Sequence, residues 1–373
     1  MTGRRSLSQQ ERLEWLRLIR SENVGPVTFK QLLQKFGSAN RALERLPELA
    51  RRGGRRKPIR VPTGGEIAKE ADRLDKLGGC LLCSCEPDYP APLVAIDDAP
   101  PVLSLLGHQH LLARPAVAVV GARNASINGR RLARDVSAGL AEAGYLVVSG
   151  MARGIDTAAH EAALPIGTAA VVAGGVDIVY PEENRPLYEN ICQSGVVLAE
   201  QPLGTEPQAR HFPRRNRIVS GLSLGVIIVE AAPRSGSLIT ARFALEQGRE
   251  VFAVPGSPLD PRARGANALL KQGAVVTENA EDILVVLSKI SDVPLAEPTG
   301  GDFQPGIPSE PDEPLLKNAR SELLLLLSPT PVAVDELLRE CQFSPSVVAT
   351  VLLELELAGR LERHPGNRIS LIA

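Results

Sequence analysis

The sequence predicts an α/β protein in which a parallel sheet, covered by helices on both faces, is flanked by two smaller domains. Three observations carry this prediction. Short apolar, β-branched runs alternate with amphipathic stretches over residues 115–288. Helical periodicity without strands fills residues 9–50. Three helical stretches and a strand-like end occupy residues 315–373, which is typical of a winged helix.

Length and charge limit the classes of function. The chain has 373 residues, enough for about two to three domains. Only 3% of the residues are aromatic, so base stacking would fall on few rings. The net charge of −1 does not describe a uniformly basic nucleic-acid binder, but basic clusters stand at residues 51–60 and 210–217. A local basic patch binds phosphates whatever the total charge.

The cysteines and the N-terminus bear on metal binding and location. Cys80, Cys83 and Cys85 lie close together, whereas Cys192 and Cys341 stand apart, which does not suit a disulfide framework. A zinc site would need a fourth ligand and there is no second CxxC, so we expect reduced thiols and no metal. The charged N-terminus lacks the apolar stretch of a signal peptide, and no apolar run approaches the ~20 residues that cross a bilayer. We therefore expect a soluble, cytoplasmic protein.

The N-terminal part is helical. A helical period is broken at residues 23–26, restarts, and stops at Gly37. A helix, a Val-Gly-Pro turn and a second helix resemble a helix-hairpin-helix, in which amides of the turn meet a phosphate. A small helical bundle with a Gly-Pro corner explains the pattern equally and is the interpretation that a single hairpin favours. With the basic, glycine-containing linker at 51–65, this domain is placed at residues 1–65.

The core domain is placed at residues 66–288 and opens with a helix at 66–77 and short strands. Its strands are expected at 116–120, 145–148, 169–173, 196–199, 225–229 and 250–254. The helices between most of them are expected at 127–143, 155–164, 184–194, 236–247 and 263–272. Parallel sheets bind ligands at the carboxyl ends of their strands, so the informative residues should follow the strands.

The first two strands are followed by turns that suit an anion. Gly121 and Arg123 follow the first strand, and the glycine spacing departs from a dinucleotide fingerprint. Amides at a helix start and a forked cation fit a phosphate, although a surface arginine on a simple turn is the alternative. Ser149, Gly150 and Arg153 follow the second strand. They again place donors and glycines at a helix start.

Two further features of these turns have structural alternatives. Asp156 and His160 are spaced to share a helix face, which more often marks a structural hydrogen bond than catalysis. Tyr180 and Asn184 follow the third strand and would pack their loop or a bound nucleotide. No Walker motif occurs, and nothing assembles a nucleophile, a base and an oxyanion hole. We therefore expect no catalytic residues.

The strongest local signal is the basic cluster around Phe212. Four arginines flank this ring, and the positions of interest are Phe212, Arg214, Arg215, Asn216 and Arg217. Arginine contacts phosphates, and a ring stacks unpaired bases with about 1–3 kcal/mol per base, so the combination favours single strands. The alternatives are a solvated charged loop, or a structural role for Arg217 and Asn216.

A third candidate turn follows the strand at 225–229. Glu230 ends that strand and precedes Ser235, Gly236 and Ser237, which open a helix and offer amides and hydroxyls to an anion.

The C-terminal part holds an acidic, proline-rich linker at 289–314 and a winged-helix-like domain at 315–373. Its helices are expected at 316–327, 332–341 and 344–358. The recognition-type helix at 344–357 carries two acids and no base, whereas major-groove reading normally needs Arg, Lys, Asn or Gln. We expect this helix to pack or to contact protein. The phosphate candidates of the wing are Arg360, Arg363, His364 and Arg368.

Several of these stretches occur in order as VGARNAS, SGMARGIDTAAHEAAL, GGVDIVYPEEN, FPRRNRIVSGLS and RSGSLITARFALEQGREVFAVPG. With them, residues 117–288 resemble the DNA-processing protein A (DprA/Smf) family. The resemblance implies an extended Rossmann-like core that binds single-stranded DNA, forms a homodimer and needs no cofactor. It implies a recombination mediator that protects incoming strands and loads RecA during natural transformation.

Carried onto this sequence, the resemblance places Arg123 and Ser149-Gly150 in a phosphate pocket. Phe212 would contact a base, Arg215 and Arg217 would add positive charge, and residues 235–237 would lie nearby. One alternative is a nucleotide-processing hydrolase of the lysine-decarboxylase-like/phosphoribohydrolase class, in which Glu230 would be the acid. Another is an adaptor that does not bind DNA.

Overall fold

The computed structural model describes residues 4–291, 312–364 and 366–372. They form two compact units, each described by itself. The core unit contains residues 4–12 and 65–291, and the accessory unit contains residues 13–64 with the described residues from 312 onward. Most of the expected linker at 289–314 lies outside the described residues. The predicted domain boundaries stay predictions.

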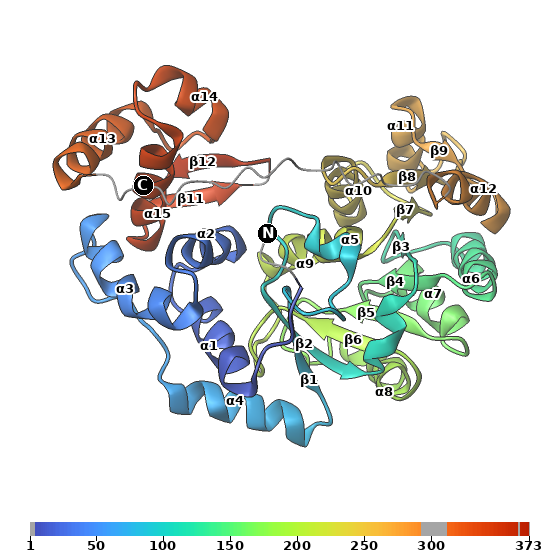
Figure 1. The fold of residues 1–373 in the computed structure, drawn as a ribbon. Helices are drawn as coiled ribbons and strands as arrows, with labels where there is room; N and C mark the ends of the chain where they lie inside the picture. The colour runs from blue at the N-terminus through green and yellow to red at the C-terminus, as the bar shows by residue number, and fades with distance from the viewer. Residues whose placement is uncertain (1–3, 292–311, 365, 373) are drawn as a thin grey trace. The chain divides into compact units, whose positions relative to one another are not determined.

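The core unit is built on a sheet of nine strands in the order β1-β2-β6-β5-β4-β3-β7-β8-β9 (Figure 1). The strands are β1 (Cys80–Cys83), β2 (Val102–Gly107), β3 (Ala116–Val120), β4 (Leu146–Ser149), β5 (Thr168–Val171), β6 (Val196–Ala199), β7 (Gly225–Ile228), β8 (Glu250–Ala253) and β9 (Val275–Val276). The run from β6 to β9 is parallel. β2 joins β6 antiparallel, and β1 joins β2 antiparallel. The predicted parallel core is thus confirmed, and it is extended beyond β6 by β2 and then β1, each antiparallel to its neighbour.

Helices connect the parallel strands at the places expected from the sequence. They are α6 (Ile127–Glu142), α7 (Ile155–Ala163), α8 (Arg185–Ser194), α10 (Gly236–Glu246) and α11 (Arg264–Lys271). α6 begins where it does because the Ser126 hydroxyl accepts a hydrogen bond from the Gly129 amide at 2.8 Å. The unit also contains α4 (Gly64–Lys76), α5 (Ala91–Val94), α9 (His211–Leu222) and α12 (Ala280–Ser291). None of the described helices is long and apolar enough to cross a membrane.

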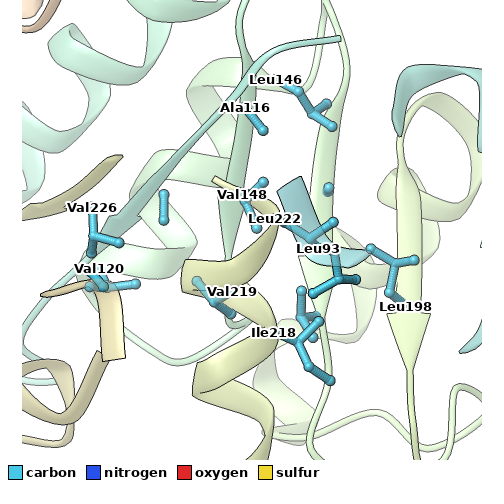
Figure 2. Packing of buried hydrophobic residues seen from close by; sticks show 14 of the residues in the cluster. Leu93, Ala116, Val120, Leu146, Val148, Leu198, Ile218, Val219, Leu222 and Val226 are labelled. Carbon is cyan, nitrogen blue, oxygen red and sulfur yellow. The ribbon is translucent and has the colours of Figure 1, made fainter. Parts of the chain in front are cut away.

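The sheet is buried on both faces because successive side chains of a strand point to opposite sides. Ala116, Ala118 and Val120 of β3 belong to one core cluster, whereas Val117 and Val119 belong to another. Figure 2 shows the first cluster, in which α9 lies across the sheet. The labelled side chains of α9 there are Ile218, Val219 and Leu222, which pack near Leu146, Val148 and Leu198 of the strands. This packing places the N-terminal end of α9 beside the carboxyl edge of the sheet.

The accessory unit joins the two ends of the chain. From the N-terminal part it takes most of α1 (Gln9–Ile19), with α2 (Pro26–Phe36) and α3 (Ala39–Arg52). Gly37 ends α2 with φ 76°, a left-handed conformation that favours glycine. From the C-terminal part it takes α13 (Glu313–Leu326), α14 (Val334–Glu340) and α15 (Pro345–Leu357), with strands β10 (Val332–Ala333), β11 (Leu361–His364) and β12 (Arg368–Leu371). These C-terminal elements form the predicted three helices and wing.

Candidate nucleic-acid interface

Most of the expected site residues follow strands whose carboxyl ends meet at one edge of the sheet. The chain runs outward from β3 through β4, β5 and β6 on one side, and through β7, β8 and β9 on the other. The direction changes between β3 and β7, which is the position where open α/β sheets bind ligands. The loops after β3, β4, β5 and β7 therefore form the candidate interface.

One cation and two rings form a row at this edge, which we call the Arg–Phe–Tyr row (Arg123, Phe212 and Tyr180). The guanidinium carbon of Arg123 lies 5.4 Å from the centroid of the Phe212 ring. The centroids of Tyr180 and Phe212 are 5.7 Å apart, with the rings tilted by 58°. Tyr180 is 49% exposed, Arg123 is exposed and Phe212 is half-buried. The row thus offers ring faces and a positive charge to solvent from three separate segments.

From the sequence, Tyr180 was expected to pack either its own loop or a bound nucleotide. Its signal was available, because it is an aromatic residue in a loop that follows a buried strand. Its packing against Phe212 could not be inferred, since the two residues come from different loops.

The basic cluster around Phe212 begins helix α9 and is not a solvated loop. Pro213 is tolerated because it lies in the first turn, where its missing amide has no helical partner. The helix separates the arginines by face: Arg214 is exposed, whereas Arg215 and Arg217 are only 7% and 5% exposed. The cluster therefore supplies fewer surface cations than its sequence suggests.

Arg215 reaches under the loop that follows β4. Its Nη1 donates a hydrogen bond to the Val171 carbonyl at 2.8 Å. A Cβ on Gly150 would lie 1.7 Å from that nitrogen, so only glycine allows this approach. Burial lowers the pKa of Arg215 to about 10, an effect that nearby Asp156 opposes. Arg215 therefore supports the loop from inside the protein.

The loop after β4 is held by two further buried side chains. The Asp156 carboxylate accepts hydrogen bonds from the amides of Gly150 at 3.1 Å and Ala152 at 3.2 Å. The Ser149 hydroxyl donates to the Val119 carbonyl at 2.6 Å. Ser149 and Gly150 are buried, so their side-chain positions face the protein rather than solvent.

Arg217 is the centre of a buried ion cluster on α9. Its guanidinium pairs with Glu200 after β6, and its Nε lies 3.4 Å from the Asp98 carboxylate. Burial opposes the charge on Arg217, but Glu200 and Asp98 outweigh it and raise the pKa of Arg217. This buried position supports a structural role for Arg217, which was the alternative to a DNA contact.

Asn216 links α9 to the third candidate turn. Its side-chain amide donates to the Gly236 carbonyl at 3.3 Å. Ser235 caps α10, and its hydroxyl lies 2.7 Å from the Ser237 hydroxyl. Gly236 is exposed and Ser237 is buried. The turn is thus joined to the start of α9.

Exposed cations surround these turns. Arg123, Arg153, Arg210, Arg214 and Arg234 are all exposed. Arg153 lies 3.4 Å from Glu183, but both side chains are more than half exposed, and such a pair is weak. Arg210 and Arg234 were not among the predicted site residues, although Arg210 lies two residues before Phe212 and Arg234 directly precedes Ser235.

A carboxylate of the protein itself occupies the turn after β3. Gly121 packs against Ile155, and Glu230 reaches the start of α6. The Glu230 carboxylate accepts from the Ser126 amide at 2.9 Å and from the Ser126 hydroxyl at 2.6 Å. This corrects the expectation that a phosphate would meet the start of α6, because a carboxylate holds that position. Glu230 thereby caps the start of α6.

His160 is fully buried, and its Nδ1 lies 2.8 Å from the Thr168 hydroxyl. Asp156 was expected to make a structural hydrogen bond to His160. Its carboxylate instead accepts hydrogen bonds from amides of its own loop. Burial, aided by Arg215, lowers the pKa of His160 from 6.5 to about 3. The imidazole is therefore neutral in the folded protein at neutral pH.

The buried imidazole predicts a pH dependence of stability. Because the folded pKa is below the unfolded one, its contribution is complete above pH 6.5 and declines as the pH falls toward 3. Between pH 7.5 and 5.5 the free energy of unfolding should fall by about 1 kcal/mol from this group. Urea unfolding of His160→Gln should show this component missing. His110→Gln, in which an exposed ring is replaced, should keep it; an unchanged pH slope in His160→Gln would contradict the assignment.

Three of the four candidate phosphate contacts of the wing have partners within the accessory unit. Arg363 pairs with Glu356 at 3.0 Å, and His364 lies 2.8 Å from the Ser370 hydroxyl. Arg368 donates to the Pro331 carbonyl at 2.6 Å. The fourth candidate, Arg360, is exposed, and phosphate binding by the wing stays a prediction.

The five cysteines are free thiols. Burial raises the pKa of Cys80, Cys83 and Cys85. The described residues contain no group of three or more His, Cys, Asp and Glu side chains that could hold a metal ion.

Known proteins resemble the chain along its whole length. Three family models match it: DNA recombination-mediator protein A over residues 80–288, the DprA-like N-terminal HHH domain over 9–72, and the DprA winged helix domain over 307–367. The second match supports the helix-hairpin-helix interpretation over the simple helical bundle. Protein Smf of Synechocystis is 32% identical over 97% of this chain and 99% of its own length. Protein Smf of Escherichia coli is 40% identical over 76% of this chain and 75% of its own length.

Two solved structures share the fold. The X-ray structure of DNA processing protein A from Streptococcus pneumoniae has a TM-score of 0.62 and 34% identity, covering 75% of this chain and 98% of that one. A structure of DNA processing protein A from Helicobacter pylori, described for its single-stranded DNA binding mode, has a TM-score of 0.53 and 31% identity. It covers 57% of this chain and 96% of its own. The chain therefore belongs to the DNA recombination-mediator protein A family.

Proposed function

We propose that this recombination-mediator family member binds single-stranded DNA at the carboxyl edge of its sheet and catalyses no reaction. The Arg–Phe–Tyr row is the observation that carries the proposal. A base must be unpaired to lie on a ring, so rings beside a phosphate-binding cation select single strands. The exposed arginines around the row add phosphate contacts that do not depend on base sequence.

One solved relative supports the binding of single-stranded DNA. The Helicobacter pylori relative is described by its mode of binding single-stranded DNA. On the basis of the family, we propose a homodimer that protects incoming strands and loads RecA during natural transformation. In this proposal Arg123, Arg153 and Arg214 contact phosphates, Phe212 and Tyr180 stack bases, and Ser235-Gly236 borders the strand. The buried residues Ser149, Gly150, Arg215 and Arg217 position these groups from beneath.

The test is a fluorescence-anisotropy titration of labelled oligo-dT at several salt concentrations. Arg123→Ala should weaken binding by about tenfold or more, because a charge-assisted hydrogen bond to phosphate is lost. It should also reduce the slope of log affinity against log salt by about 0.7, the value for one phosphate on a single strand.

Arg131→Ala is the matched control, since Arg131 lies exposed on α6 beside Asp135. It should leave both the affinity and the salt slope unchanged. Absence of wild-type binding even at low salt would overturn the proposed function.

A further inference from the structure

Helix α15 occupies the position of the DNA-reading helix of a winged helix, yet it is largely buried. In DNA-binding domains of this type, that helix presents polar side chains to the major groove. Nine of the thirteen residues of α15 are buried here, and the side chain of Glu354 is fully covered. One face of α15 packs into the core of the winged helix itself. The N-terminal helices α3 and α2 also contact α15.

The end of α3 meets α15 at backbone distance. A Cβ on Gly53 would lie 1.9 Å from the Glu354 carbonyl oxygen and 2.8 Å from the Cβ of Ala358. Gly53 has an ordinary φ of −66°, so the backbone conformation itself would allow any residue. The close approach of α15 is therefore what requires glycine at this position.

The hairpin turn between α1 and α2 meets the end of the same helix. The side-chain amide of Asn23 donates to the Leu357 carbonyl at 3.2 Å, which satisfies one of the free carbonyls at the end of α15. Asn23 has φ 58° and opens the Asn-Val-Gly-Pro turn. A helix-hairpin-helix would offer this turn to a phosphate, and here the turn carries a contact to protein.

Charge also matches across this contact. Arg52 at the end of α3 lies 3.3 Å from Glu313 of α13. Glu354 is paired with Arg320 of α13 beneath the approach of Gly53. The basic end of α3 thus faces helices that carry acids. The two acids of α15 pair within the winged-helix part, Glu354 with Arg320 and Glu356 with Arg363.

We infer that α15 is a docking surface for the N-terminal helical domain of the same chain and does not read DNA. Docking covers the recognition-type helix with α3 and engages the hairpin turn through Asn23. The two accessory domains thereby cover one another's potential duplex-binding surfaces, the hairpin turn and α15. The inference does not depend on the single-stranded DNA site of the core unit.

Hydrogen exchange of the full chain tests this docking with a matched pair of glycine substitutions. Gly53→Ala should accelerate exchange of the amides of α15 and of the hairpin turn by at least about tenfold, because the added methyl group cannot fit against the backbone of α15. Gly64→Ala is the control, since a Cβ there meets nothing within 4 Å. It should exchange as the wild type does.

A milder variant distinguishes a loss of docking from general unfolding. Asn23→Gly keeps the positive φ but removes the amide that caps α15, so faster exchange should be confined to the turn and the end of α15. Binding of oligo-dT by the core unit should be unchanged in both variants. Equal exchange of α15 in wild type and Gly53→Ala would overturn the inference, and so would protection of α15 in the wild type on adding a 20-base-pair duplex.

Discussion

Replacing Arg217 by alanine is expected to lower the free energy of unfolding by about 3–5 kcal/mol, the usual cost of removing one partner from a buried ion pair. Glu200, whose side chain is 13% exposed, would lose its ion pair with Arg217, and so would Asp98. The loss would be felt in single-stranded DNA binding as well, because Arg217 fixes the helix that begins with His211 and Phe212.

Urea unfolding with a parallel oligo-dT titration separates the two roles considered for this arginine. Arg214→Ala is the control on the same helix, since Arg214 is exposed. It should leave the unfolding midpoint within about 0.5 kcal/mol of wild type and reduce the salt slope of DNA binding. If Arg217→Ala kept wild-type stability and lost only DNA binding, Arg217 would instead be a direct phosphate contact.

The repeated alternation of strands and helices could be predicted because each element is determined by its own local sequence pattern. Each buried strand is a short β-branched run, and each following helix has an apolar face, so residues 116–120 and 127–143 could be placed without knowing what they touch. The expected bounds agree with β3 and α6 within one residue. The two antiparallel strands, β1 and β2, were not individually placed because their runs are short and their partners are distant in the sequence.

The roles of individual arginines could not be predicted from the sequence, because they depend on partners that are distant in the chain. Arg214, Arg215 and Arg217 are nearly adjacent in the sequence. All three were candidates for DNA contact, with a structural role as the stated alternative for Arg217. Which of them is buried follows from how α9 lies on the sheet, and the acids that neutralise Arg217 come from residues 98 and 200. Arginine is normally a surface residue, so nothing in the local pattern marks an internal one.

The role of Glu230, which follows β7, was also hidden from the sequence because its partner at the turn after β3 is distant. The glycine and serine pattern after β3 correctly predicted a helix start with free amides. The carboxylate that fills it comes from Glu230, more than a hundred residues later. A sequence pattern therefore identifies a place that attracts an anion without identifying which anion takes it.

Replacing Phe212 by alanine is expected to weaken oligo-dT binding by about fivefold to 150-fold, which corresponds to the 1–3 kcal/mol that stacking on a ring contributes per base. No charge is removed, so the salt slope should stay at the wild-type value. Anisotropy titrations at several salt concentrations measure both quantities. Tyr180→Ala should have a smaller effect in the same direction, because Arg123 and Phe212 would remain together.

Phe212→Leu distinguishes stacking from packing. Phe212 is half-buried, so part of the loss in Phe212→Ala could arise from a loosened start of α9. Leucine keeps most of the apolar volume and removes the flat face on which a base lies, so it should bind nearly as poorly as alanine while unfolding close to wild type. Wild-type affinity in Phe212→Leu would mean that the ring only supports the helix. The exposed arginines would then account for the binding, and the preference for unpaired strands would need a different origin.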